Sequence, residues 1–252
     1  MDPEIWFTEK YGNNVGLTFK VKEILKTQTS QYQRLDIIDT YEFGKVMLLD
    51  GLVMLTQKDE FIYHEMISAV AVMSLKNRNK ALIIGGGDGG TARELTKYDF
   101  KKIIEVEIDE VVVENSKKFL DNDKRVEVII GDGIEFVKNT SEKFDLIIID
   151  STDPFGAAEG LFSGEFYSNV YNILNDDGIV VAQAENPYYN PDWFLKSRKN
   201  MQKAFGANTL NYCAFIPTYP SGMWLFSIGY KNINLHDYFN EELYKKNANS
   251  YK

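Results

Sequence analysis

The chain has 252 residues, of which 44% are hydrophobic and 26% charged, and this composition excludes disordered and collagen-like chains. Its formal net charge of −9 disfavours non-specific attraction to a phosphate backbone, so we expect no nucleic-acid partner. Cys213 is the only cysteine and no apolar run approaches the roughly 20 residues of a membrane span, which predicts a cytoplasmic protein without a membrane partner.

Residues 1–58 are predicted to form a small antiparallel β domain. Apolar and β-branched residues favour strands over residues 16–20, 32–41, 45–49 and 52–57. Asp50 and Gly51 separate the last two strands. Because both residue types tolerate a positive φ, this pair predicts a type I′ hairpin.

Residues 59–252 are predicted to form a second, α/β domain. Apolar side chains recur at helical spacing from Ile62 to Met73, behind Asp59 as an expected N-cap. Strands and helices then alternate, with strands expected over residues 81–84, 103–108, 126–130, 144–149 and 179–182, followed by an antiparallel pair over 209–215 and 223–228. Such a series forms a Rossmann-like, doubly wound and mostly parallel sheet.

Three smaller features complete the predicted second domain. Ser163 is expected to cap a helix, and Asn190 with Pro191 is expected to begin another. The polar tail after Asn240 is expected to be frayed.

A glycine-rich stretch, GGGDGG at residues 85–90, follows one predicted strand and precedes a helix. Glycines at such a turn let the backbone approach a nucleotide closely. Dehydrogenases, methyltransferases and other nucleotide-binding proteins share this pattern, and in some proteins the glycines serve only to pack the helix against the strand. The stretch therefore predicts a nucleotide site without identifying the nucleotide.

Acidic residues follow the next two predicted strands. Glu107 ends the second strand, where its carboxylate can accept hydrogen bonds from both ribose hydroxyls of an adenosine. Asp132, followed by Gly133, comes directly after the third strand and can accept a hydrogen bond from the exocyclic amine of adenine. Helix capping is the alternative role for both acids, and for Asp132 it is equally supported. Together the two positions predict an adenosine site.

The segment Asp150-Ser151-Thr152-Asp153-Pro154 follows the buried strand that ends at Ile149. Two carboxylates at the reactive end of a nucleotide suit the binding and deprotonation of an amine. A simple turn is the alternative interpretation, but it does not account for an aspartate at the strand terminus.

Over nearly its whole length the chain resembles the spermidine synthase family. The motifs that carry the resemblance are QYQ (31–33), DEFIYHEM (59–66), GGGDGG (85–90), VEID (106–109), GDG (131–133), DSTDP (150–154) and TYPSG (218–222). The resemblance implies a methyltransferase-like fold and a homodimer or homotetramer. It also implies transfer of the aminopropyl group of decarboxylated S-adenosylmethionine to putrescine, giving spermidine and methylthioadenosine, without a metal or prosthetic group.

The resemblance also implies roles for individual residues. The positions that hold the methylthioadenosine portion of the donor correspond to Gln33, Glu107, Asp132 and Gly133. The amine-binding positions correspond to Tyr63, His64, Asp153 and Tyr219. Asp88 reaches the aminopropyl ammonium, and Asp150 is the proton acceptor, with Tyr63 orienting the same amine. A core histidine is the alternative interpretation of His64.

One departure from the family pattern concerns the loop after DSTDP, where family members commonly have proline and this chain has Ala157. Alanine leaves the loop more freedom and is expected to weaken its closure by ~0.5 kcal/mol.

Alternative functions are an S-adenosylmethionine-dependent methyltransferase, a non-catalytic polyamine or nucleoside binding module, and a nicotinamide dehydrogenase. The acids Asp88 and Asp150 with Tyr63 favour aminopropyl transfer over the first two. A dehydrogenase is disfavoured because the sequence shows no clear second mononucleotide-binding half. Cadaverine, agmatine and spermidine are alternatives to putrescine as the acceptor.

Overall fold

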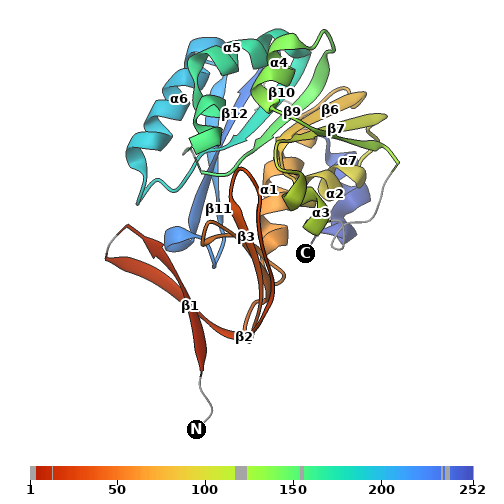
Figure 1. Cartoon of the computed structure of the whole chain (residues 1–252). Coiled ribbons are helices and arrows are strands. Elements are labelled where there is room, and N and C mark those ends of the chain that lie inside the picture. Colours follow the sequence, from red (N-terminus) through yellow and green to blue (C-terminus); the bar gives the residue numbers. More distant parts are fainter. Residues whose placement is uncertain are drawn as a thin grey trace.

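The structure is a computed structural model that describes residues 4–12, 14–116, 124–153, 156–233, 235 and 239–251. The described chain forms two sheets, a five-stranded N-terminal sheet and a larger sheet of seven strands. Figure 1 shows the N-terminal strands, in red and orange, below the larger sheet and the helices that cover it. The expected division into domains at residue 58 stays a prediction.

The N-terminal sheet is antiparallel, with its strands in sequence order. Its strands are β1 (Ile5–Tyr11), β2 (Val15–Thr29), β3 (Arg34–Thr40), β4 (Gly44–Leu49) and β5 (Leu52–Thr56). Asp50 and Gly51 have φ values of 50° and 82°, which confirms the predicted type I′ geometry of the hairpin. Strand β1 was not predicted, and β2 extends nine residues beyond the expected end at residue 20, because both carry polar side chains on exposed faces.

The larger sheet is mixed, with five parallel strands and an antiparallel pair at one edge. Its strands are β6 (Lys80–Gly85), β7 (Lys102–Glu107), β8 (Val126–Ile130), β9 (Phe144–Asp150), β10 (Leu174–Gln183), β11 (Thr209–Phe215) and β12 (Met223–Tyr230). They lie in the order β11-β12-β10-β9-β6-β7-β8. This arrangement confirms the predicted doubly wound, mostly parallel sheet.

Helices cover both faces of the larger sheet (Figure 1). The helices are α1 (Glu60–Val72), α2 (Gly90–Thr96), α3 (Glu110–Ser116), α4 (Gly133–Asn139), α5 (Gly164–Ile173), α6 (Pro191–Phe205) and α7 (Glu241–Asn247), with short 3₁₀ turns η1 (Gly156–Phe162), η2 (Pro220–Gly222) and η3 (Ala248–Ser250). Ile83 of β6 packs in the core with α1, α2 and α7, whereas its neighbour Leu82 packs with α4, α5 and α6. Burial on both faces explains the continuous apolar runs of the central parallel strands β6 and β9.

Helix α3 packs between the N-terminal sheet and the larger sheet. Its Val112 belongs to a buried cluster with Leu35 and Ile37 of β3 and Leu49 of β4. The two sheets are therefore connected by apolar packing close to the carboxyl ends of the parallel strands. Among the described helices, none has the length and apolar character to cross a membrane.

Two of the predicted N-caps need correction. Ser163 accepts a hydrogen bond of 3.1 Å from the backbone N–H of Phe166 and caps α5 as expected. Asp59 and Asn190 occupy the expected N-cap positions directly before α1 and α6, but neither side chain makes a capping hydrogen bond. Asp59 is instead turned toward Thr218, and Asn190 donates to Glu185.

The prediction of a frayed tail after Asn240 is wrong. Asn240 caps α7 by accepting a hydrogen bond of 2.9 Å from the backbone N–H of Leu243. Leu243 is buried in the core, and the hydroxyl of Tyr251 lies 2.9 Å from that of Tyr98. A few apolar contacts are enough to dock this polar segment.

Candidate active site

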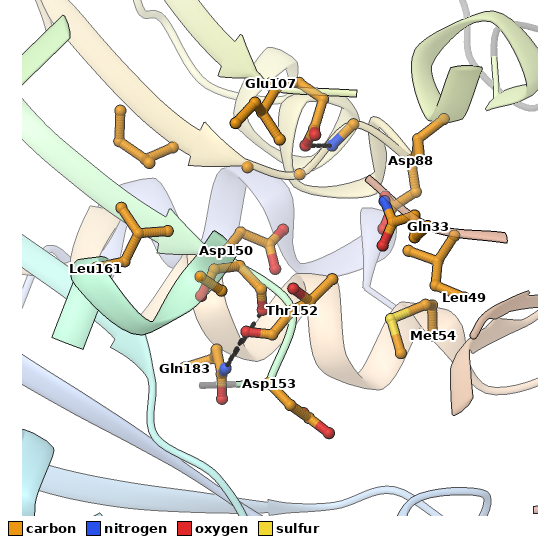
Figure 2. Close-up of a pocket in the computed structure, with 18 of the residues that line it drawn as sticks. Gln33, Leu49, Met54, Asp88, Glu107, Asp150, Thr152, Asp153, Leu161 and Gln183 are labelled. Carbon is orange, nitrogen blue, oxygen red and sulfur yellow. Dashed lines mark hydrogen bonds between the residues drawn. The ribbon is translucent and has the colours of Figure 1, made fainter. Parts of the chain in front are cut away.

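A cavity of about 380 Å³ lies at the carboxyl ends of the parallel strands. Strand β6 has β7 on one side and β9 on the other, so the cavity sits where the chain changes direction along the sheet, the usual ligand position in such folds. Figure 2 shows that Gln33, Leu49 and Met54 of the N-terminal sheet line the cavity beside Asp88. Both sheets therefore build the site.

Glu107 lies at one end of the cavity and is buried against the glycine-rich stretch. Its two carboxylate oxygens accept hydrogen bonds from the backbone N–H groups of Asp109, at 2.8 Å, and Gly87, at 3.2 Å. Burial raises the pKa of Glu107 to about 7, although the two hydrogen bonds lower it in part. A Cβ on residue 87 would lie 2.5 Å from Cγ of Glu107, so a glycine is required at this position for close approach.

Gln33 reaches the cavity from the N-terminal sheet. Its Nε2 donates a hydrogen bond of 2.9 Å to Asp109, and the same carboxylate oxygen accepts 2.7 Å from the hydroxyl of Ser30. The other oxygen of Asp109 accepts from the backbone N–H of Val111 in α3. Asp109 therefore anchors Gln33 at the wall of the cavity near Glu107.

Asp132 lines the cavity and is also the N-cap of α4. Its Oδ1 accepts hydrogen bonds from the backbone N–H groups of Ile134, at 2.7 Å, and Glu135, at 3.4 Å. Capping is thus established for Asp132, and contact with adenine stays a prediction. Gly133 also lines the cavity, and a Cβ there would lie 2.4 Å from a methyl carbon of Ile84.

Asp150 ends β9 in the middle of the cavity (Figure 2) and is 8% exposed. Its Oδ1 accepts a hydrogen bond of 2.6 Å from the hydroxyl of Tyr63, and its Oδ2 accepts one of 2.6 Å from the hydroxyl of Thr91. Burial raises the pKa of Asp150, and the negative charge of Asp88 raises it further. A carboxylate with a raised pKa accepts protons more readily near neutral pH.

Asp88 and His64, which were both expected to bind the substrates, are in contact with each other. Oδ1 of Asp88 lies 3.3 Å from Nε2 of His64 and accepts a hydrogen bond of 2.6 Å from the backbone N–H of Gly90. The other ring nitrogen of His64 lies 2.6 Å from Glu60. His64 is 2% exposed, so its ring belongs to a buried polar network.

Aromatic side chains form the opposite end of the cavity. The ring of Tyr219 lies 5.8 Å from that of Tyr63 and 4.8 Å from that of Trp224. The hydroxyl of Tyr219 donates a hydrogen bond of 2.6 Å to the backbone carbonyl of Met54 in β5. The tyrosine therefore presents its ring to the cavity and uses its hydroxyl to bind the N-terminal sheet.

Asp153 lines the cavity (Figure 2). It lies close enough to two further acids, Glu185 and Glu9, for their charges to interact. Burial raises the pKa of Asp153. Burial and the charge of Asp153 raise the pKa of Glu185 to about 8, and burial raises that of Glu9 to about 7. Glu185 is 2% exposed, and its Oε1 has no hydrogen-bond partner among the described residues. Because their pKa values are raised, these three neighbouring acids retain part of their protons near neutral pH, and together they carry less than three negative charges in this part of the site.

Sequence reasoning missed several residues that support the site. Nε2 of Gln183 donates to the backbone carbonyls of Ser151, at 3.3 Å, and Thr152, at 3.2 Å, and so holds the DSTDP segment (Figure 2). Gln183 ends β10, and its position at a strand terminus was the signal available. For Glu9, in the unpredicted β1, the sequence carried no such signal.

The segment that carries Tyr219 is held from two sides. Asp59 accepts hydrogen bonds from the backbone N–H of Thr218, at 3.1 Å, and from its hydroxyl, at 2.8 Å. Nδ2 of Asn186 donates to the hydroxyl of Ser221 at 2.8 Å, where the backbone has a φ of 57°.

The expected effect of Ala157 on loop closure stays a prediction, because the side chains of residues 154–157 lie outside the described part of the chain.

Family models match almost the whole chain. Residues 60–238 match the spermine/spermidine synthase domain, and residues 5–57 match the spermidine synthase tetramerisation domain. The second match indicates that the N-terminal sheet takes part in oligomerisation.

Individual relatives extend this finding. The polyamine aminopropyltransferase of Thermoplasma volcanium is 49% identical over 89% of this chain and 85% of its own length. That of Clostridium kluyveri is 45% identical over 96% of this chain and 94% of its own length.

Solved structures agree in fold. A spermidine synthase in complex with the transition state analogue AdoDATO superposes with a TM-score of 0.92 at 42% identity, covering 96% of this chain and 85% of that one. The spermidine synthase of Thermotoga maritima superposes with a TM-score of 0.91 at 42% identity, covering 96% and 84%. The chain therefore belongs to the spermidine synthase family and is an aminopropyltransferase.

Proposed function

We propose that the protein transfers the aminopropyl group of decarboxylated S-adenosylmethionine to putrescine and releases spermidine and methylthioadenosine. The observation that carries the proposal is the order of acids along one cavity, with Glu107 at one end, Asp88 and Asp150 in the middle and Asp153 at the other. The substrates match this order. The nucleoside of the donor lies at Glu107, the donor ammonium and the attacking amine lie at Asp88 and Asp150, and the second amine of putrescine lies at Asp153. The solved relative bound to the transition state analogue AdoDATO supports it.

The donor is held by the residues around Glu107. Glu107 accepts hydrogen bonds from the ribose hydroxyls, and Asp132 accepts from the adenine amine, with Gly133 and Gln33 completing the methylthioadenosine site. Their places on the cavity wall support these roles. Asp88 binds the ammonium of the aminopropyl group. Its negative charge disfavours S-adenosylmethionine, which carries a carboxylate beside its ammonium.

The reaction needs a base because a primary ammonium with a pKa near ~10.4 is almost fully protonated at neutral pH. Exposing its lone pair costs about 4.6 kcal/mol at pH 7. Asp150 takes this proton, and its buried position with a raised pKa supports that role. Tyr63, hydrogen-bonded to Asp150, orients the same amine. The new C–N bond forms as the C–S bond breaks, and the sulfonium leaves as a neutral thioether.

The acceptor lies between the rings of Tyr63, Tyr219 and Trp224, which match a short polymethylene chain. Asp153 binds the far ammonium, and this cation favours the ionised forms of the neighbouring acids Glu185 and Glu9, whose pKa values burial raises in its absence. The aromatic side chains close this end of the cavity, so putrescine is preferred over the longer spermidine.

Incubation with an equal mixture of putrescine, cadaverine, agmatine and spermidine tests the acceptor, when the donor carries an isotope label in its aminopropyl group and the products are identified by mass. Labelled spermidine is expected as the main product with the decarboxylated donor, and no transfer is expected from S-adenosylmethionine itself. A product mixture dominated by spermine would contradict the proposed acceptor.

The far ammonium site has its own test. Asp153→Asn is expected to raise the KM for putrescine by roughly tenfold or more, because it removes a charged partner, and to leave the KM for n-butylamine nearly unchanged. Asp176→Asn, at an exposed position, is the matched control. Equal effects on both amines would exclude Asp153 as the partner of the second ammonium.

The nucleoside site is tested by Glu107→Ala, which removes two ribose hydrogen bonds to a charged group. The affinity for methylthioadenosine is expected to fall by about 1.5 to 3 kcal/mol in titration calorimetry. Unchanged affinity would exclude the ribose assignment.

We further propose a homodimer or homotetramer. The match of residues 5–57 to a tetramerisation domain supports this assembly. Ile5 and Trp6 of β1 and Ile24 and Leu25 of β2 are exposed, large and hydrophobic, which is typical of a contact surface. Sedimentation analysis distinguishes the two assemblies from a monomer.

A further inference from the structure

The carboxylate of Asp88 is held on one side only. Oδ1 accepts the backbone N–H of Gly90 at 2.6 Å and lies 3.3 Å from Nε2 of His64. No hydrogen bond to Oδ2 is made by the described part of the chain. One oxygen is therefore used to fix the side chain, and the other remains available to a ligand in the cavity.

His64 has no ring nitrogen left for a substrate. Nδ1 lies 2.6 Å from Oε2 of Glu60, and Nε2 faces Asp88. A ring placed between two carboxylates donates from both nitrogens only as an imidazolium. Gly90 makes room for this ring, because a Cβ there would lie 2.2 Å from Cε1 of His64.

Glu60 is itself held by a cation from the neighbouring helix. Oε2 of Glu60 accepts a hydrogen bond of 2.7 Å from Nη2 of Arg93 in α2. Neither Glu60 nor Arg93 is among the residues that line the cavity. Charges of alternating sign thus run from Arg93 through Glu60 and His64 to Asp88.

The groups around His64 favour this arrangement of charges. Burial alone would lower the pKa of His64, but the charge of Asp88 and hydrogen bonds with Asp88 and Glu60 raise it to about 10, with a further contribution from Asp150. Burial alone would raise the pKa of Glu60, but hydrogen bonds with His64 and Arg93 lower it to about 2. Both partners of the buried pair are therefore ionised at neutral pH.

We propose that Glu60, supported by Arg93, is a positioning residue for the donor: it holds His64 as an imidazolium that fixes Asp88 with its free oxygen toward the aminopropyl ammonium. This inference rests on the proposed function, in which Asp88 binds that ammonium. His64 then acts through Asp88 and does not touch the amine.

The imidazolium has a second effect on the site. Asp88 lies in a cavity that also contains the carboxylates of Asp150 and Glu107. Removing one partner from a buried ion pair leaves an uncompensated charge. Without the donor, the negative charge of Asp88 would be uncompensated. The imidazolium of His64 compensates it from the side of Oδ1 and leaves Oδ2 for the donor ammonium.

The test compares two ligands that differ in the aminopropyl group. Titration calorimetry measures the affinity of Glu60→Gln for decarboxylated S-adenosylmethionine and for methylthioadenosine, which lacks the ammonium. Affinity for the decarboxylated donor is expected to fall roughly ten- to a hundredfold, and that for methylthioadenosine to change less than about twofold. Glu65→Gln removes an acid from the same helix, at a position paired with Lys97, and is expected to bind both ligands normally.

Nitrogen NMR provides a readout that binding alone does not give. The chain has two histidines, His64 and His236, and a His64→Gln variant assigns the signals. In the wild type at pH 8, both ring nitrogens of His64 are expected to be protonated. In Glu60→Gln, the His64 signals are expected to move toward those of a neutral ring.

Asp88→Asn separates failure of this inference from failure of the proposed function. If Asp88→Asn binds the decarboxylated donor normally, the assignment of Asp88 to the ammonium is wrong. If Asp88→Asn loses donor affinity while Glu60→Gln retains it, the positioning role of Glu60 is overturned. Equal losses for both ligands in Glu60→Gln would also overturn it, because they would show general damage to the site.

Discussion

The hydroxyl of Tyr63 donates a hydrogen bond of 2.6 Å to Oδ1 of Asp150, and so α1 is joined directly to the end of β9. Thr91 of α2 donates to the other oxygen at 2.6 Å. The carboxylate is thereby held in one orientation at the middle of the cavity. Such a rigid and buried group is suited to act as a base on an amine placed beside it.

Replacement of Asp150 by asparagine keeps the shape of the side chain and removes the base. The kcat of Asp150→Asn is expected to fall by about 10² to 10⁴, the usual contribution of a general base. Affinity for methylthioadenosine is expected to remain near that of the wild type, because Glu107 ends β7 and Asp132 follows β8. Steady-state rates with saturating substrates and calorimetry measure the two effects.

A rise in pH is expected to rescue this variant in part, because more of the acceptor amine arrives already neutral. A misfolded protein would show no such rescue. If Asp150→Asn retains the wild-type kcat at pH 7, the base is a different residue, and Asp153 and Tyr63 are the next to test.

Gly90→Ala tests the packing between the glycine-rich stretch and His64. Gly90 begins α2 and has no positive φ, so alanine meets no backbone strain. Its Cβ would nevertheless lie 2.2 Å from the buried ring of His64, and the ring must move. We expect a loss of roughly tenfold or more in donor affinity, on the scale of the overpacking cost.

Gly131→Ala is the matched control for this steric effect, because a Cβ at residue 131 would have no atom of the described residues within 4 Å beyond its chain neighbours. Donor binding by the two variants is compared in the same calorimetric assay. Normal binding by Gly90→Ala would show that the ring adapts without cost.

Thr218→Val tests the anchor of the segment that carries Tyr219. Valine keeps the backbone hydrogen bond to Asp59 and removes the one from the hydroxyl, at 2.8 Å. The free energy of unfolding is expected to fall by about 1.5 to 3 kcal/mol, the range for a hydrogen bond to a charged group. The KM for the acceptor is expected to rise, because Tyr219 follows directly in the chain.

The conservative variant Thr218→Ser keeps the hydroxyl and is expected to restore both properties. Chemical denaturation and acceptor kinetics provide the measurements. If valine and serine behave alike, the hydroxyl does not contribute to the anchor.

The burial of Glu105 is expected to make the free energy of unfolding depend on pH. It is 3% exposed in β7, and burial together with the charges of Asp88, Glu107 and Asp150 raises its pKa from 4.5 to about 9. The folded state therefore keeps a proton that the unfolded state loses above pH 4.5. This contribution to stability is fully present below pH 4.5 and is lost as the pH rises toward 9.

Glu105→Gln replaces the acid by a neutral group of the same shape and removes this dependence. At pH 8 the variant is expected to be more stable than the wild type by on the order of 2 to 4 kcal/mol. At pH 5 the two are expected to be nearly equal. Glu23→Gln, at an exposed position of β2, is the control. Parallel pH profiles for wild type and Glu105→Gln would contradict the expected shift.

Most of the fold could be predicted from the sequence because its signals are local. The Asp50-Gly51 pair has the positive φ values that a type I′ turn requires, and apolar runs buried on both faces mark the parallel strands. Strand β1 and helix α7 were not predicted, because their polar side chains carry little periodicity. Strand β1 is ordered by pairing with β2, where Phe7 lies opposite Phe19. The segment of α7 is docked through contacts with residues far along the chain, such as that of Tyr251 with Tyr98.

The sequence by itself determined which acids gather at the cavity, since Glu107, Asp132 and Asp150 end parallel strands or follow them, and the carboxyl ends of such strands meet at one edge. Only the tertiary structure decided what holds each of these groups. Thr91 reaches Asp150, and Glu60 reaches Asp88 through His64. These contacts depend on the angles at which helices pack on the sheet, and packing angles leave no periodic pattern in the chain.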